Sequence, residues 1–137
     1  MRTLLFILCA LWASIVQAEG LFVIVSTLVP DSSISTAQLA NIYSLKKNAW
    51  SDDASIVPIN REASSQERDK FTEAVFHLST RELAEYLDRL RFQGKLPPVV
   101  QTSDQAVIAF VRNVPGAIGY INAEHVPEGV KVLIKIP

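Results

Sequence analysis

The run LFVIVS at residues 21–26 constrains the fold of this chain more than any other feature. Its five apolar side chains are consecutive, mostly β-branched, and do not alternate with polar residues. Such a run is typical of a strand that is covered on both faces, whereas a half-exposed strand alternates. We therefore expect a sheet with a layer of helices on each side.

The rest of the chain alternates helical and extended patterns. Ser35 with Gln38 and Ser79 with Glu82 have the spacing of capping boxes, so helices are predicted to begin at both serines. A further helix is predicted over residues 65–77, and another after Thr102 or Ser103. Extended patterns occupy residues 55–60, 99–100, 117–121 and 130–136. This order predicts an α/β domain with a mostly parallel sheet flanked by helices.

Two predicted strands carry hints about their place in the sheet. Pro58 lacks a backbone N–H group, so residues 55–60 are predicted to lie near an edge or to end irregularly. Residues 130–136 alternate and include Lys131 and Lys135, which suggests an edge strand with its lysines facing water.

The first eighteen residues have the pattern of a signal peptide. Arg2 precedes an apolar run from Leu4 to Val16, and Ala18 ends a segment with the pattern of a cleavage site. The run is about 13 residues long, which is shorter than the roughly 20 that span a bilayer. We expect a signal peptide at residues 1–18, a periplasmic domain at 19–137, and no membrane insertion after cleavage. An uncleaved membrane anchor is the alternative.

Composition limits the partners of the exported part. The single cysteine, Cys9, lies in the predicted signal peptide, so the remainder needs neither a disulfide nor a thiolate. The chain has 13 basic and 14 acidic side chains, and removal of Arg2 with the signal peptide brings the formal charge to −2. This balance predicts no nucleic-acid partner and no attraction to an anionic membrane surface.

Patterns of catalytic residues are scarce. His77 and His125 do not belong to a metal-ligand spacing such as HExxH, and neither GxSxG nor GxxxxGK[ST] occurs. We expect no catalytic residue, no metal, no cofactor and no enzymatic activity.

One segment, NREASSQERDKF at residues 60–71, has the residues of an anion site. It follows a predicted strand and opens a predicted helix, whose N-terminal N–H groups and dipole favour an anion. Arg61 can add a bidentate clamp, and Ser64 and Ser65 can add hydroxyl donors. Arg61, Ser64 and Ser65 are therefore the candidate anion-binding residues.

The same segment has a second interpretation that needs no ligand. Ser64 and Glu67 have the spacing of another capping box, which would only start the helix. Glu62 and Glu67 would also repel an anion and partly cancel Arg61. The local pattern leaves both interpretations open.

Three blocks resemble the substrate-binding proteins of phosphate ABC transporters. Leu39-Ala40-Asn41-Ile42-Tyr43, with Lys46-Lys47, Trp50 and Asp52, is similar to the family's L-x-x-I-F/Y-x-G-K-x-x-x-W-x-D-G signature. Residues 56–61 followed by Ser65 resemble its strand and R-x-x-G-S-G-T phosphate loop. VRNVPGAIGY at residues 111–120 is similar to its V-x-x-x-P-G-A-I-G-Y segment.

The resemblance implies a periplasmic-binding-protein-like fold and a reduced site. Family members have two lobes that close on phosphate, and this chain resembles the second lobe alone. Arg61 and Ser65 are the two ligand-type residues that carry over, whereas Gln66 and Glu67 replace the loop's second glycine and its threonine. Close backbone approach to an anion is therefore less favourable here.

Two functions follow as expectations. The first is weak binding of phosphate or a similar oxyanion by an exported single-lobe relative of the family. The second is a periplasmic interaction module without a ligand, which contacts an ABC transporter, a sensor domain or a second copy of itself.

Overall fold

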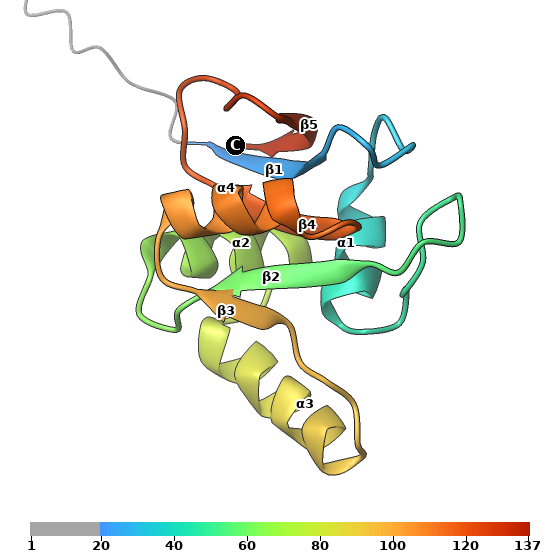
Figure 1. The fold of residues 1–137 in the computed structure, drawn as a ribbon. Helices are drawn as coiled ribbons and strands as arrows, with labels where there is room; N and C mark the ends of the chain where they lie inside the picture. The colour runs from blue at the N-terminus through green and yellow to red at the C-terminus, as the bar shows by residue number, and fades with distance from the viewer. Residues whose placement is uncertain (1–19) are drawn as a thin grey trace, which may run out of the picture.

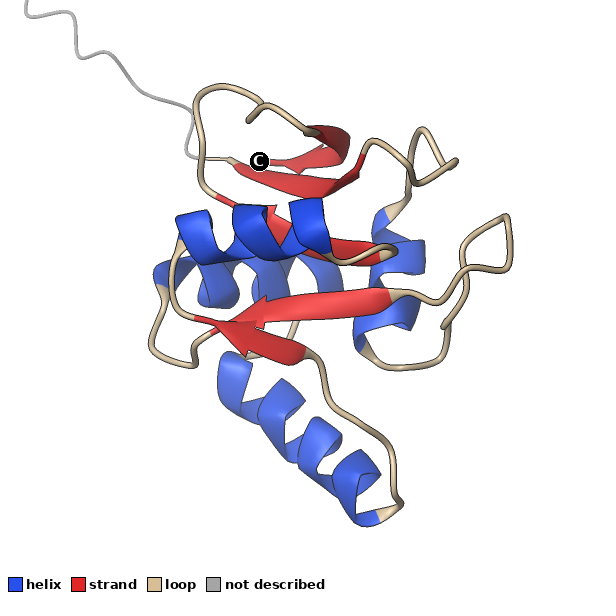
Figure 2. Ribbon diagram, in the orientation of Figure 1, coloured by secondary structure: helices blue, strands red, loops and turns tan. Residues whose placement is uncertain are grey.

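The computed structural model describes residues 20–137, so the predicted signal peptide lies outside the described residues. One five-stranded sheet is flanked by helices (Figures 1 and 2). The elements in chain order are β1 (Leu21–Ser26), α1 (Thr36–Tyr43), β2 (Val57–Arg61), α2 (Gln66–Phe76), α3 (Thr80–Phe92), β3 (Val99–Gln101), α4 (Asp104–Asn113), β4 (Ala117–Ile121) and β5 (Val130–Ile136).

The sheet has the order β3-β2-β4-β1-β5. β2 pairs in parallel with β3 and with β4, while β1 pairs antiparallel with β4 and β5. Four strands therefore run in one direction and β1 runs against them. The predicted α/β class is confirmed, and β5 is the edge strand that its alternating pattern indicated.

Helices cover both faces of the sheet, as the apolar run at β1 required. On one face, α1 and α2 place Leu39, Tyr43 and Phe71 over Val23 and Tyr120 in a single buried cluster. On the other face, Val107 and Val111 of α4 pack with Ile24, Ile59 and Ile121. Because β1 is buried from both sides, a polar side chain in its interior would lose its hydrogen bonds to water and would find no hydrogen-bond partner in the core.

Local signals at the helix starts are largely confirmed. Ser35 and Ser79 both cap their helices in full capping boxes, and Ser103 caps α4. The inference from Pro58 that this strand lies near an edge is confirmed, because β2 lies next to the edge strand β3. The missing N–H is tolerated there since β3 is short and begins to pair with β2 only at Ile59.

The Trp and Pro-Gly motifs meet in space. Trp50 is buried, and its indole Nε1 donates to the carbonyl oxygen of Gly116 at 2.9 Å. Gly116 has φ +80°, and a Cβ atom there would lie 2.0 Å from the carbonyl oxygen of Ser55. The turn before β4 therefore requires glycine.

Candidate functional site

The candidate anion-binding segment lies where β2 and β3 end. Arg61 is the last residue of β2 and pairs with Gln101, the last residue of β3. Because these strands are parallel, the starts of α2 and α4 lie at the same edge of the sheet (Figure 1). Ligands of open α/β sheets bind at this kind of edge, outside the carboxyl ends of the strands.

The guanidinium group of Arg61 is held by carboxylates of the same chain. Its Nε donates to Glu62 Oε2 at 3.0 Å and its Nη2 to Glu62 Oε1 at 3.3 Å, which is a two-bond clamp. Its Nη1 donates to Asp104 Oδ1 at 2.6 Å, and Glu67 Oε2 lies 4.0 Å from the same nitrogen. Only 8% of the Arg61 side chain is exposed.

The pKa shifts reflect this arrangement. The hydrogen bond from Arg61 lowers the pKa of Glu62, whereas burial raises the pKa of Asp104 although the Arg61 charge opposes it. Burial alone would lower the pKa of Arg61, but Glu62, Asp104 and Glu67 together raise it. The carboxylates of Glu62, Asp104 and Glu67 therefore stabilise the charged form of Arg61.

A buried polar network supports the backbone of Arg61 from below. Its N–H lies 3.1 Å from Asn60 Oδ1 and 3.1 Å from the Tyr120 hydroxyl oxygen, and that hydroxyl donates to Asn60 Oδ1. Arg68 Nη1 donates to the Arg61 carbonyl oxygen at 3.0 Å. Phe71 stacks on the Tyr120 ring with centroids 4.0 Å apart. Hydrogen bonds to both its N–H group and its carbonyl oxygen therefore hold the backbone of Arg61 at the end of β2.

The two candidate serines have different places. Ser65 is buried and is the N-cap of α2, where its hydroxyl oxygen accepts from the Arg68 N–H at 3.0 Å. Ser64 is exposed in the loop before it. The predicted Ser64–Glu67 capping box was therefore wrong by one residue, because Ser65 takes the cap and Glu67 lies toward Arg61 instead.

The electrostatic balance around Arg61 is negative. One guanidinium faces three carboxylates, so a phosphate would have to displace Glu62 or Asp104 while the remaining negative charges repel it. The helix N-terminus still favours an anion, but Glu67 and Asp69 already place two carboxylates in the first turn of α2. The guanidinium group of Arg61 therefore already pairs with anions that the chain itself supplies.

Asp104 is the contributor that sequence reasoning missed. It lies in the first turn of α4, and it reaches Arg61 from 43 residues away along the chain. A signal was present, since a capping serine followed by Asp after a predicted strand places a carboxylate at the edge where the neighbouring strand ends. Arg68 lies in the candidate segment of residues 60–71, but the sequence did not predict that its side chain would be buried and would donate to the Arg61 carbonyl oxygen.

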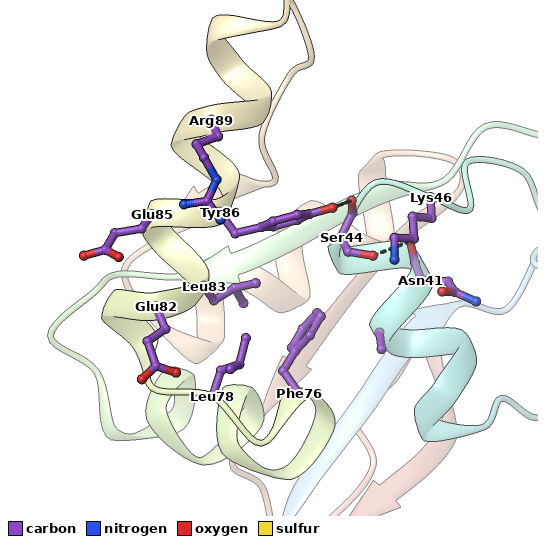
Figure 3. A pocket seen from close by; sticks show the side chains of 11 residues that line it. Asn41, Ser44, Lys46, Phe76, Leu78, Glu82, Leu83, Glu85, Tyr86 and Arg89 are labelled. Atoms are coloured by element: carbon purple, nitrogen blue, oxygen red, sulfur yellow. Dashed lines mark hydrogen bonds between the residues drawn. The ribbon is translucent and has the colours of Figure 1, made fainter.

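A separate groove lies between α1 and α3, away from Arg61 (Figure 3). Its volume is about 510 Å³. The Tyr86 hydroxyl donates across it to the Ser44 carbonyl oxygen at 3.3 Å. Its lining mixes apolar side chains with two cations and two carboxylates and consists of Ala40, Asn41, Ser44, Lys46, Phe76, Leu78, Glu82, Leu83, Glu85, Tyr86 and Arg89.

Several solved structures are similar to this chain, and two of those named here are described as phosphate transport proteins. One is a proposed phosphate ABC transporter substrate-binding protein with bound phosphate from Clostridium perfringens, with a TM-score of 0.70 and 26% identity over 84% of this chain and 44% of that one. PstS from Borrelia burgdorferi has a TM-score of 0.61 and 26% identity, and the match covers 75% of this chain and 40% of that one. An ABC-type phosphate transport receptor from Vibrio cholerae shares the fold, with a TM-score of 0.67 and 22% identity. That match covers 84% of this chain and 45% of the receptor.

The chain therefore spans less than half the length of these relatives. A search of curated proteins gives no match. The family model described as a PBP superfamily domain matches residues 10–132, which is most of the sequence. The resemblance to phosphate ABC-transporter substrate-binding proteins is thus confirmed at the level of the fold, and this chain belongs to the PBP superfamily domain family.

Proposed function

We propose that this chain is an exported, phosphate-binding-protein-like domain that binds phosphate or a similar oxyanion only weakly. The observation that carries the proposal is the clamp on Arg61, whose guanidinium already donates to Glu62 and Asp104. Membership of the family and its phosphate-binding relatives support the class of ligand. The internal carboxylates support the low affinity.

The affinity follows from the bonds that a phosphate would replace. Charge-assisted hydrogen bonds contribute about 1.5–3 kcal/mol each, and here they are already made within the chain. An incoming anion would therefore only replace one set of hydrogen bonds to Arg61 with another, and the carboxylates that remain nearby would repel it. We expect a dissociation constant no tighter than about 1 mM, which corresponds to roughly −4 kcal/mol.

Calorimetric titration with phosphate, and separately with sulfate, tests this proposal. Wild-type protein should give weak binding, and Arg61→Ala should abolish it. Arg81→Ala is the matched control, because Arg81 is an exposed arginine on α3. Micromolar binding by a monomer would contradict the proposal. Micromolar binding by a dimer alone would mean that a second chain completes the site.

A second candidate function is an interaction module that contacts a transporter, a sensor domain or another copy. The observation that favours it is β3, a three-residue edge strand with Val99 37% and Val100 52% exposed. Such an edge can accept a strand from a partner. Two results together would favour this function over the first. Calorimetric titration with phosphate would show no heat of binding, and the protein would form a complex that Val100→Lys disrupts.

A further inference from the structure

The C-terminal end of α3 carries two large apolar side chains in water. Phe92 is 92% exposed and Leu96 is 87% exposed, the two highest values among the large hydrophobic residues of the described chain. Between them, Gly94 adopts φ +85° and turns the chain back toward β3. Figure 1 shows this end of α3 and the loop after it standing away from the sheet. We call residues 89–96 the tip.

Apart from Leu90, the tip is not part of the domain core. The buried stripe of α3 is Leu83, Leu87 and Leu90, which packs with Leu45, Phe76 and Tyr86. Single exposed apolar residues are common on protein surfaces. Two of them on either side of one tight turn, at the far end of a projecting helix, form a local apolar knob.

The charge of the tip is opposite to that of the whole chain. Between Asp88 and Asp104 the sequence contains Arg89, Arg91 and Lys95 and no carboxylate, whereas the chain as a whole has a formal charge of −1. Arg91 lies 3.6 Å from Asp88, but both are exposed and the pair is screened by water. Arg89 lies over the Tyr86 ring at 5.9 Å. The knob is therefore bordered by three exposed cations.

We propose that the tip docks on an anionic lipid bilayer, with Phe92 and Leu96 entering the interface and Arg89, Arg91 and Lys95 on the headgroups. Aromatic and aliphatic side chains beside basic residues are the pattern of interfacial membrane contacts. The whole-chain charge predicted no such attraction, but the local charge of the tip differs from it. No helix among residues 20–137 is long and apolar enough to cross a membrane.

The charge of the tip also disfavours a second copy at this surface. A two-fold contact between tips would bring together two sets of three cations, and like charges at an interface are repulsive. An anionic lipid surface has the opposite charge over a wide area and accepts a convex knob without a preformed pocket. The proposal is independent of the oxyanion site, because the tip shares no residue with it.

Cosedimentation with vesicles tests the proposal on the full chain. Wild-type protein should bind vesicles of phosphatidylcholine and phosphatidylglycerol, and binding should weaken in pure phosphatidylcholine or in about 0.5 M salt, which screens charge. Phe92→Ser with Leu96→Ser should lower the partition coefficient at least tenfold. Leu28→Ser is the matched control, because Leu28 is 82% exposed in the turn after β1 and should leave binding unchanged.

A second variant separates charge from apolar contact. Arg91→Gln with Lys95→Gln should weaken binding to the anionic vesicles while leaving binding to pure phosphatidylcholine unchanged. Thermal melts of the variants check whether these exposed substitutions keep the fold. Failure of wild-type protein to bind, or equal binding by the Phe92 and Leu96 double variant, would overturn the proposal. So would a dimer in light scattering that the same double variant dissolves, since the tip would then be a protein interface.

Discussion

Leu87→Ala should destabilise the protein by removing the centre of the α3 stripe. Leu87 is 6% exposed and lies between Leu83, at 2%, and Leu90, at 9%. These three leucines form a cluster of their own, which α3 uses to pack against the rest of the domain. Loss of the middle side chain therefore weakens the attachment of the whole helix.

The structure favours the lower part of the usual range for such a change. Leu→Ala substitutions in cores cost about 2–5 kcal/mol, and the cost falls where neighbours can collapse into the space. Leu83 and Tyr86 border a groove of about 510 Å³, so side chains around the cluster have room to move. We expect a loss of about 2–3 kcal/mol in the free energy of unfolding.

Urea denaturation followed by circular dichroism measures this loss. With a slope of about 1–3 kcal/mol per molar urea, the midpoint should fall by roughly 0.7–3 M. Glu85→Ala is the control on the same helix, because the Glu85 side chain is 61% exposed and its pair with Arg81 is 3.9 Å long. That change should cost less than about 0.5 kcal/mol. Equal midpoints for the two variants would refute the assigned helix face.

Three further predictions concern other parts of the chain. Gly116→Ala should lower the melting temperature strongly, because the new Cβ would meet the Ser55 carbonyl oxygen, and thermal melts against Gly94→Ala, which has open space, check this. Sulfate binding should strengthen as the pH falls from about 7 toward the ordinary Asp value of 3.8, because the raised pKa of Asp104 lets this carboxylate protonate above that value and release Nη1 of Arg61; calorimetry that shows no change would count against this. Intact-mass measurement of the exported protein should give a chain that begins near Glu19, and a mass that retains residues 1–18 in the membrane fraction would contradict cleavage.

The sequence predicted the elements of the fold well because their signals are local. Two capping boxes and one unbroken apolar run were sufficient to place α1, α3 and β1, and each depends on residues within one or two turns. Pro58 indicated a strand near an edge but not the strand that covers that edge, because the backbone donor that it lacks matters only where a neighbour strand is present. The length of β3 decides that, and no residue near Pro58 reports it.

The site was predictable only in part. The sequence predicted Arg61 at the end of a strand and a helix start beside it, but two adjacent serines made the N-cap ambiguous by one residue. The ion pair between Arg61 and Asp104 joins two separate strand–helix connections, so it depends on the register of β2 against β3. That register is a tertiary property, and the local pattern of either segment does not contain it.

The most direct test of the account is to release Arg61 from its own carboxylates. Phosphate should be titrated calorimetrically into wild-type protein, Asp104→Asn and Glu62→Gln, with Glu128→Gln as an exposed control outside the site. Removal of one like charge beside the anion should strengthen binding at least tenfold over the wild type, a gain of about 1.4 kcal/mol. Glu128→Gln should change nothing. Micromolar binding by the wild-type monomer, or no gain in either site variant, would contradict the claim that internal carboxylates occupy the oxyanion site.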